Sequence, residues 1–161
     1  MNKLLLFVFL LNVGCMQAQS PSSEKIIDEI FDQYGDREEM NTLTLSGSFL
    51  KAFQSQEDTA GSGKNFPKQM QSFRMINTKE GNANPVDKQV YDKLISSLNR
   101  EKWEPVVETR SKGEATTVFL RQGSGEKADA IVLSWNKDKF SLISLSGFFK
   151  MEDLENMTFE N

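Results

Sequence analysis

Residues 129–148 read DAIVLSWNKDKFSLISLSGF, and this stretch decides the fold class. Ile131, Leu133 and Trp135 recur at every second position, which is the period of a strand that buries one face. The polar turn NKDK interrupts this apolar pattern near its middle. The stretch therefore predicts two antiparallel strands joined by a short turn, with Trp135 in the core rather than on a ligand-binding surface.

The same period of two extends back to Trp103. The turn sequences SKGE, GSGEKA and NKDK divide this part of the chain into segments spaced about ten residues apart, which is typical of an antiparallel meander. Four consecutive strands are therefore expected, at 104–111, 115–122, 129–136 and 139–148.

Two segments upstream of the meander have helical periodicity instead. Ser20-Pro21 predicts the N-cap and first-turn proline of the first helix, and Gly35 its end. Its apolar stripe consists of Ile26, Ile27, Ile30, Phe31 and Tyr34. The second helix is expected to start in the same way at Asn84-Pro85. Its apolar stripe consists of Val86, Val90, Leu94, Ile95 and Leu98.

Between these helices the residues alternate at 41–49 and 69–78, which predicts two further strands. A helical turn at 50–54 and an exposed loop at 55–65 separate them. The order predicts an α+β domain with a mostly antiparallel sheet of about five to six strands and two main helices packed on one face. A short tail helix is expected after the C-terminal four-strand meander, with an apolar stripe of Met151, Leu154 and Met157.

One short motif occurs twice in the predicted strands. Its residues are Leu45, Ser46, Gly47 and Phe49 in the first copy and Leu145, Ser146, Gly147 and Phe149 in the second. Glycine inside a strand suits a bulge or a close approach of another backbone, so the favoured interpretation is two strands that leave the sheet in the same way. Leu45, Leu145 and Phe149 would then pack in one core. A ligand-binding loop used twice and an internal duplication are the alternatives.

The N-terminal sequence MNKLLLFVFLLNVGCMQAQ has the layout of a secretory signal peptide. Lys3 precedes an apolar run of ten residues. This run is too short to cross a bilayer, which takes about 20 residues. Cleavage after Ala18 would separate a signal peptide, 1–18, from a single α+β domain, 19–161. No later segment reaches membrane length, so no transmembrane segment is expected.

Gly14-Cys15 suggests a second processing route, in which Cys15 is lipidated and becomes the first residue. The position three residues before Cys15 holds Asn12, where a lipobox usually has leucine. The main expectation is therefore an exported, periplasmic or secreted protein. A lipoprotein anchored to a membrane surface through Cys15 is the alternative.

The mature chain lacks the side chains that most catalytic and metal sites use. It has no histidine, and cleavage after Ala18 removes Cys15, its only cysteine. We therefore expect no catalytic residue, no metal and no cofactor. Cleavage also removes Lys3 and leaves 18 basic against 23 acidic side chains, a net charge of −5. No clustered basic face is evident, so no nucleic-acid partner is expected.

Carboxylates supply the one catalytic alternative. They gather in two places along the chain, at Asp36, Glu38 and Glu39 and at Glu152, Asp153 and Glu155. A glycosidase needs two carboxyl groups about 5 to 9.5 Å apart in a cleft. Acidic groups next to helix ends are more typical of solvated surfaces and dipole partners.

Three segments carry a resemblance to a known family. They are YGDRE at 34–38, LTLSGSFLK at 43–51 and FSLISLSGFFKMEDLENM at 140–157. With these segments the chain resembles the domain of unknown function 4252 family of Bacteroidetes cell-envelope proteins, over most of the mature sequence. The resemblance implies the fold and an envelope location, and it implies no activity.

The sequence thus favours an exported cell-envelope protein that is a non-catalytic binding or accessory module. Its partner would be another envelope protein or a surface ligand. A carboxylate-dependent hydrolase acting on glycan or peptide is one alternative, and a self-assembling structural envelope protein is another. The oligomeric state is left open.

Intact-mass measurement of the protein purified from its native host tests the processing prediction. We expect a mass that begins at Gln19. A mass that begins at Cys15 with added acyl chains would show the lipoprotein, and an intact chain from Met1 would contradict both routes.

Overall fold

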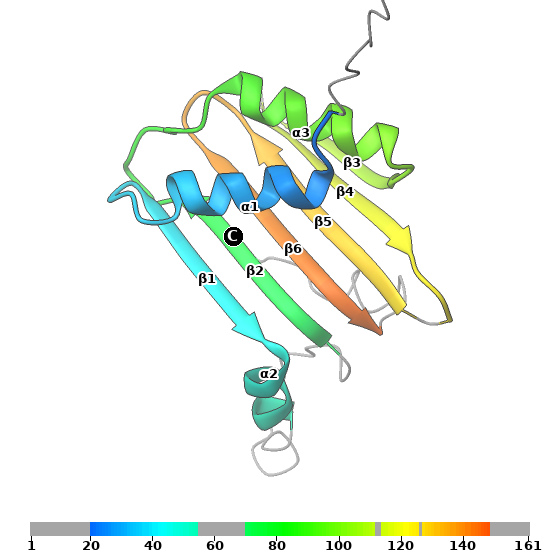
Figure 1. The fold of residues 1–161 in the computed structure, drawn as a ribbon. Coiled ribbons are helices and arrows are strands. Elements are labelled where there is room, and N and C mark those ends of the chain that lie inside the picture. Colours follow the sequence, from blue (N-terminus) through cyan, green and yellow to red (C-terminus); the bar gives the residue numbers. More distant parts are fainter. Residues whose placement is uncertain (1–19, 55–69, 112–113, 126, 149–161) are drawn as a thin grey trace, which may run out of the picture.

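The computed structural model describes residues 20–54, 70–111, 114–125 and 127–148, and Figure 1 labels its elements. In chain order these are α1 (Ser23–Tyr34), β1 (Met40–Ser46), α2 (Gly47–Gln54), β2 (Met70–Thr78), α3 (Lys88–Arg100), β3 (Glu104–Ser111), β4 (Glu114–Gln122), β5 (Lys127–Trp135) and β6 (Phe140–Phe148). The fold is α+β, as the sequence predicts. The expected signal peptide, Cys15, the loop 55–65 and the tail helix lie outside the described residues.

The six strands form one antiparallel sheet in the order β1-β2-β6-β5-β4-β3. The last four strands follow one another as the expected meander. Its final strand, β6, then pairs with β2, so that Phe73 lies opposite Leu145 and Met75 opposite Ile143. This one pairing joins the first two strands to the meander and makes a single sheet of both.

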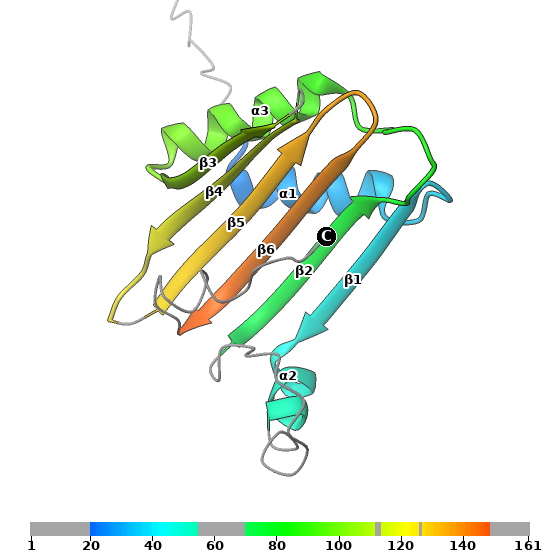
Figure 2. The same cartoon turned by 180° about the vertical axis from the view of Figure 1, so that it is seen from behind.

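Two helices, α1 and α3, lie side by side across one face of the sheet (Figures 1 and 2). Their apolar stripes meet the central strands in the larger hydrophobic core. Ile30, Leu94 and Leu142 lie at its centre, with 1%, 0% and 0% of their surface exposed. Trp135 packs against this core and donates its indole N–H to the carbonyl of Val86 at 2.9 Å, which confirms the core assignment of this side chain.

The first helix starts two residues later than its proline suggests. Ser22 is the N-cap, and its side chain accepts a hydrogen bond from the backbone N–H of Lys25. The prediction that Ser20-Pro21 starts the helix is therefore wrong. A hydroxyl that accepts from the first turn satisfies one of the unpaired donors there, and Ser22 does this in place of Ser20.

The start of α3 is displaced in the same direction. Asp87 is the N-cap and accepts from the N–H of Gln89 at 2.8 Å, so the expected start at Asn84-Pro85 is wrong. The Asn84 side chain is engaged in a turn instead. Its Oδ1 accepts from the N–H of Val86 at 2.9 Å, and its Nδ2 donates to the carbonyl of Asn136 at 2.8 Å.

Strand β1 ends at Ser46, three residues before the predicted end at 49. Gly47 is the first residue of α2. A Cβ at Gly47 would lie 3.0 Å from the carbonyl oxygen of Gln71, so a side chain at this position would be crowded by the β2 backbone. The glycine therefore marks the point where the chain leaves the sheet.

The sheet face away from α1 and α3 is called the open face below. It carries a second apolar cluster, which consists of Leu50, Met70, Phe73, Ala128, Ala130, Ile143 and Leu145. The helix α2 packs against β1 and β2 at one end of the sheet and contributes Leu50 to this cluster (Figure 2). Among the described residues, no helix is both long and apolar enough to cross a membrane.

Two leucine truncations test the position of the core. Leu142→Ala should lower the free energy of unfolding by about 2–5 kcal/mol, because Leu142 is fully buried beneath the helices. Leu43→Ala is the matched control on β1, where 41% of the residue surface is exposed, and it should cost less than about 1 kcal/mol. Urea denaturation measures both. Equal losses would contradict the layered arrangement.

Candidate functional site

The repeated motif occupies one level of the sheet. Phe73 of β2 is the register partner of both Leu45 and Leu145, and Ser72 is the partner of the serine that follows each leucine. Since β1 and β6 both run antiparallel to β2, they run parallel to each other with β2 between them. The two copies are therefore level with each other and one strand apart.

The copies differ in their surroundings. Gly47 begins α2, whereas Gly147 is buried within β6 opposite Met70 and Ala128. Phe49 lies on α2 with 51% of its surface exposed, and Phe149 lies outside the described residues.

Among the remaining motif residues, Leu145 belongs to the open-face cluster and Leu45 packs against it. Ser46 is exposed and its hydroxyl lies 3.4 Å from that of Ser48, while Ser146 is half-buried. The described motif residues do not form one shared polar site.

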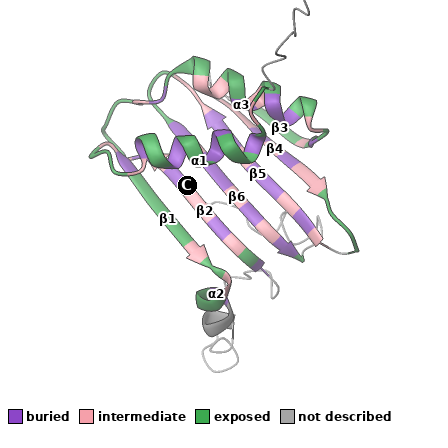
Figure 3. Ribbon diagram, in the orientation of Figure 1, coloured by how far each residue is buried: buried purple, intermediate pink, exposed green. Residues whose placement is uncertain are grey.

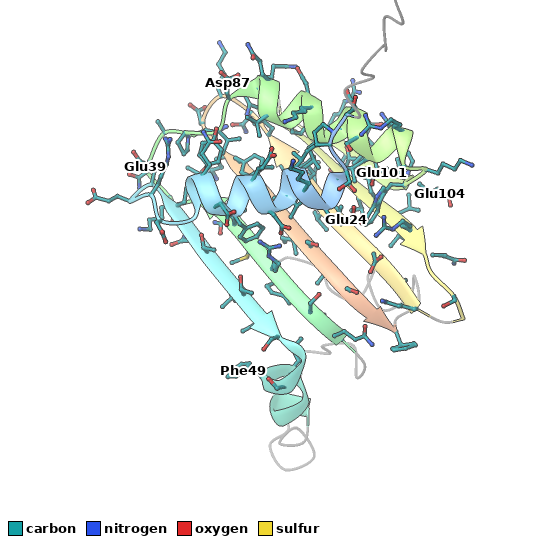
Figure 4. The ribbon with its side chains drawn as sticks, viewed as in Figure 1. Glu24, Glu39, Phe49, Asp87, Glu101 and Glu104 are labelled. Carbon is teal, nitrogen blue, oxygen red and sulfur yellow. The ribbon has the colours of Figure 1, made fainter. Side chains whose placement is uncertain are left out.

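A polar cluster that the sequence does not predict joins the start of α1 to the end of α3. The Glu101 carboxylate accepts from the backbone N–H of Ser23 at 2.7 Å and from its hydroxyl at 2.5 Å. Ser97, one turn before Glu101, lies with its hydroxyl 3.1 Å from the same carboxylate. Arg100 donates to the carbonyl of Pro21 at 2.7 Å. Figure 4 shows Glu101 at the N-terminal end of α1, near Glu24.

These contacts set the charge of Glu101. Burial alone would raise its pKa, but the hydrogen bonds from Ser23 and Ser97 outweigh burial and hold the pKa of Glu101 below its ordinary value. A carboxylate is also favoured at a helix N-terminus, where the backbone N–H groups are unpaired. Glu101 is therefore an ionised link between two helices, and both of its carboxylate oxygens accept hydrogen bonds there.

A second ionic group lies beside the first. The Arg121 guanidinium stacks on the ring of Trp103, 4.4 Å from its centroid. It pairs with Glu24 of α1 at 2.7 Å and with Asp129 of β5 at 3.0 Å. Arg121 therefore links α1 to the meander. Its two carboxylate partners, Glu24 and Asp129, are both engaged in ion pairs with it.

The carboxylates singled out in the sequence do not assemble with these groups. Asp36 and Glu38 are exposed after α1, Glu39 is half-buried, and Glu152, Asp153 and Glu155 lie outside the described residues. In the described ranges, no group of three or more acidic or cysteine side chains could hold a metal ion.

The two edges of the sheet differ in kind. The outer strand β3 contains Pro105, a register shift between Pro105 and Val107, and charged side chains at Glu108 and Arg110. Proline, bulges and charges are the devices that keep another strand from pairing with a sheet edge. Along its length β1 reads MNTLTLS, with no proline, no charge and no register shift.

The backbone of β1 presents unused donors and acceptors to the outside. The N–H of Lys79 donates to the carbonyl of Glu39 at 2.8 Å, one pair beyond the Met40–Thr78 end of the β1–β2 ladder. Hydrogen-bonded pairs alternate along an antiparallel ladder, so Thr42 and Thr44 direct their N–H and C=O away from β2. No described strand pairs with this side.

The exposed side of β1 also has an apolar component. Leu43 is 41% exposed on the open face and lies opposite Met75, beside the half-buried Leu45. Figure 3 shows β1 exposed along most of its length, in contrast to the buried residues of the central strands. The outward backbone of β1 and the exposed Leu43 beside it form one surface, which is called the β1 edge below.

Comparison with known proteins gives one match. The family model described as domain of unknown function (DUF4252) matches residues 34–157. This range begins at the last residue of α1 and includes every strand. No curated protein and no solved structure matches the chain.

The Glu101 link predicts a specific pH dependence. A carboxylate with a lowered folded-state pKa stabilises the fold above its unfolded pKa of about 4.3, and this contribution is lost as the pH falls through the folded pKa. Glu101→Gln should therefore cost about 1–2 kcal/mol at neutral pH, and the difference from wild type should shrink below about pH 4.

Urea denaturation over a pH series measures this effect. The control is Glu104→Gln, the same change at an exposed position on β3, which should leave stability unchanged. A loss for Glu101→Gln that did not vary with pH would show that the carboxylate charge is not the stabilising element.

Proposed function

Because the chain belongs to the family described as domain of unknown function (DUF4252), whose description states no activity, we propose a function from its surface: a non-catalytic binding module of the cell envelope that takes an extended segment of a partner protein onto the β1 edge. The observation that carries this proposal is the contrast between the two sheet edges. The β3 edge is protected by proline, a register shift and charges, and β1 has none of these.

The mode of binding follows from the geometry of β1. An extended peptide that adds a strand to a sheet edge gains affinity from main-chain hydrogen bonds and specificity from alternate side chains. Thr42 and Thr44 supply the outward N–H and C=O groups. Leu43 supplies apolar contact on the open face for the side chain that the bound segment places opposite it on that face.

The non-catalytic character is supported by how the acidic groups are used. A carboxyl that acts as a general acid at neutral pH needs a raised pKa. The pKa of Glu101 is lowered, and its oxygens accept from Ser23 and Ser97. Glu24 and Asp129 are engaged with Arg121. A carboxylate-dependent hydrolase would need a different pair of acidic side chains.

The envelope location rests on the N-terminal sequence. Residues 1–18 have the charge and apolar pattern of a signal peptide, and lipidation at Cys15 is the alternative route. By either route the binding domain is exported to the cell envelope. Its partner is then another envelope protein or a ligand on the envelope surface.

Self-assembly through the same edge is the competing function. Two copies paired antiparallel about Leu43 would place each Thr42 opposite a Thr44, and threonine pairs are favourable across strands. Multi-angle light scattering separates the two functions. The partner-binding proposal expects a monomer at every soluble concentration, and a dimer abolished by Thr44→Pro would favour self-assembly.

The proposal predicts that one outward N–H on β1 is essential for binding. Thr44→Pro removes this donor, and proline is tolerated on an edge strand where the N–H faces solvent, so the fold should persist. Thr44→Val is the matched control, because it keeps the donor and the branched side chain. Peptides selected from a random displayed library should bind wild type and Thr44→Val and lose at least about tenfold in affinity for Thr44→Pro, a loss of about 1.4 kcal/mol.

Backbone hydrogen exchange of the wild-type complex completes this test. A bound strand should slow exchange at the amides of Thr42 and Thr44. Equal binding by Thr44→Pro, with a circular dichroism spectrum like that of wild type, would refute strand addition at β1.

A further inference from the structure

The central strands are buried on the open face as well as under the helices. Ala130 of β5 is 0% exposed, and Leu145 and Ile143 of β6 are 2% and 6% exposed. A sheet face in the middle of a domain excludes water only when another layer packs on it. The one described helix on this side, α2, packs against β1 and β2 at the end of the sheet (Figure 2).

The shape of this face suits an added layer of large side chains. Ala128 and Ala130 on β5 and Gly147 on β6 are small residues and neighbours in register, since Ala128 lies opposite Gly147 and Ala130 opposite Leu145. Because these side chains are small, the surface of the sheet is recessed over β5 and β6. Interiors are packed nearly without voids, so the space above them calls for bulky apolar partners.

One stretch of the chain has the composition for this layer. Residues 149–161 read FKMEDLENMTFEN. Five of these side chains are large and apolar, Phe149, Met151, Leu154, Met157 and Phe159. The stretch between α2 and β2, 55–69, is SQEDTAGSGKNFPKQ, and Phe66 is its only large apolar residue. The family model continues to residue 157, past the end of β6, so the family pattern includes most of the C-terminal stretch.

We propose that residues 149–161 fold back over the open face and pack on the cluster around Ala130, Ile143 and Leu145. The segment starts at the end of β6, directly beside the surface that it would cover. The nine residues of β6 extend about 30 Å at about 3.3 Å per residue. The thirteen remaining residues span about 20 Å as a helix or about 43 Å extended, so both forms reach the cluster.

The spacing within the segment favours a helix laid across the strands. Met151, Leu154 and Met157 recur every third position, which places them on one face of a helix. Glu152, Asp153 and Glu155 fall between them and would face water. The open face over β5 and β6 is then an internal docking surface for residues 149–161, and this inference does not depend on the function proposed for the β1 edge.

Matched triple variants of the 19–161 chain test this inference. The stripe variant removes the apolar stripe and carries three changes, Met151→Asp, Leu154→Asp and Met157→Asp. The control variant changes three of the residues between them, Glu152→Gln, Asp153→Asn and Glu155→Gln. The first should bind the dye ANS, which reports exposed apolar surface, and should lose thermal stability. The control should do neither.

The methyl NMR signals of two isoleucines show which face of the sheet becomes exposed in the stripe variant. Ile143 lies on the open face and Ile131 lies on the helix face of the neighbouring strand. A soluble paramagnetic agent should broaden the Ile143 methyl signals in the stripe variant and leave those of Ile131 unchanged. Equal protection of Ile143 in the stripe variant and the control would overturn the proposal.

Photo-crosslinking tests the same contact without removing the stripe. A benzophenone amino acid in place of Leu154 keeps a large apolar side chain at that position. Crosslinks to β5 or β6 peptides carrying Val132, Ile143 or Leu145 are expected. Crosslinks to α1 or α3, or none within the chain, would refute the docking of residues 149–161 on the open face.

Discussion

The pairing of β2 with β6 is the contact on which the rest of the structure depends. It joins two helices and two strands from the first half of the chain to a meander from the second half. Without it, α1 would have no central strands to cover and α3 would pack against the meander alone. Through Phe73 and Ser72, the same pairing brings the two Leu-Ser-Gly motifs level across β2. The repeated motif thus marks a shared position in the sheet.

A second constraint fixes the helices relative to each other. Glu101 follows α3, yet its carboxylate accepts from the first N–H of α1. Arg121 adds a cation from β4 that reaches Glu24 on the first turn of the same helix. The N-terminus of α1 is therefore held by charged groups from two distant segments, so the two-helix layer is set by electrostatics at one end and by apolar packing along its length.

Periodicity predicts much of this fold because it reports which residues are buried. The stripe of α1 and the alternation of Ile131, Leu133 and Trp135 are found in the structure as expected. Alternation within one strand does not show which other strand pairs with it. The sequence therefore predicts neither the β2–β6 pairing nor which strands form the two edges of the sheet. Helix starts depend on single hydrogen bonds, and Asn84 uses its side chain in a turn where a cap was expected. The Glu101 link joins residues 78 positions apart and has no local signal.

The order of the strands also sets the order in which the protein can fold. A chain is synthesised from its N-terminus, so β1 and β2 are made long before β6, the strand that joins them to the other described strands. Contacts between distant segments slow folding, because the entropy of closing a long loop opposes them. Before β6 is present, the β1–β2 hairpin and α1 lack the central strands that complete their hydrophobic core. We therefore expect completion of the sheet to be a late step in folding.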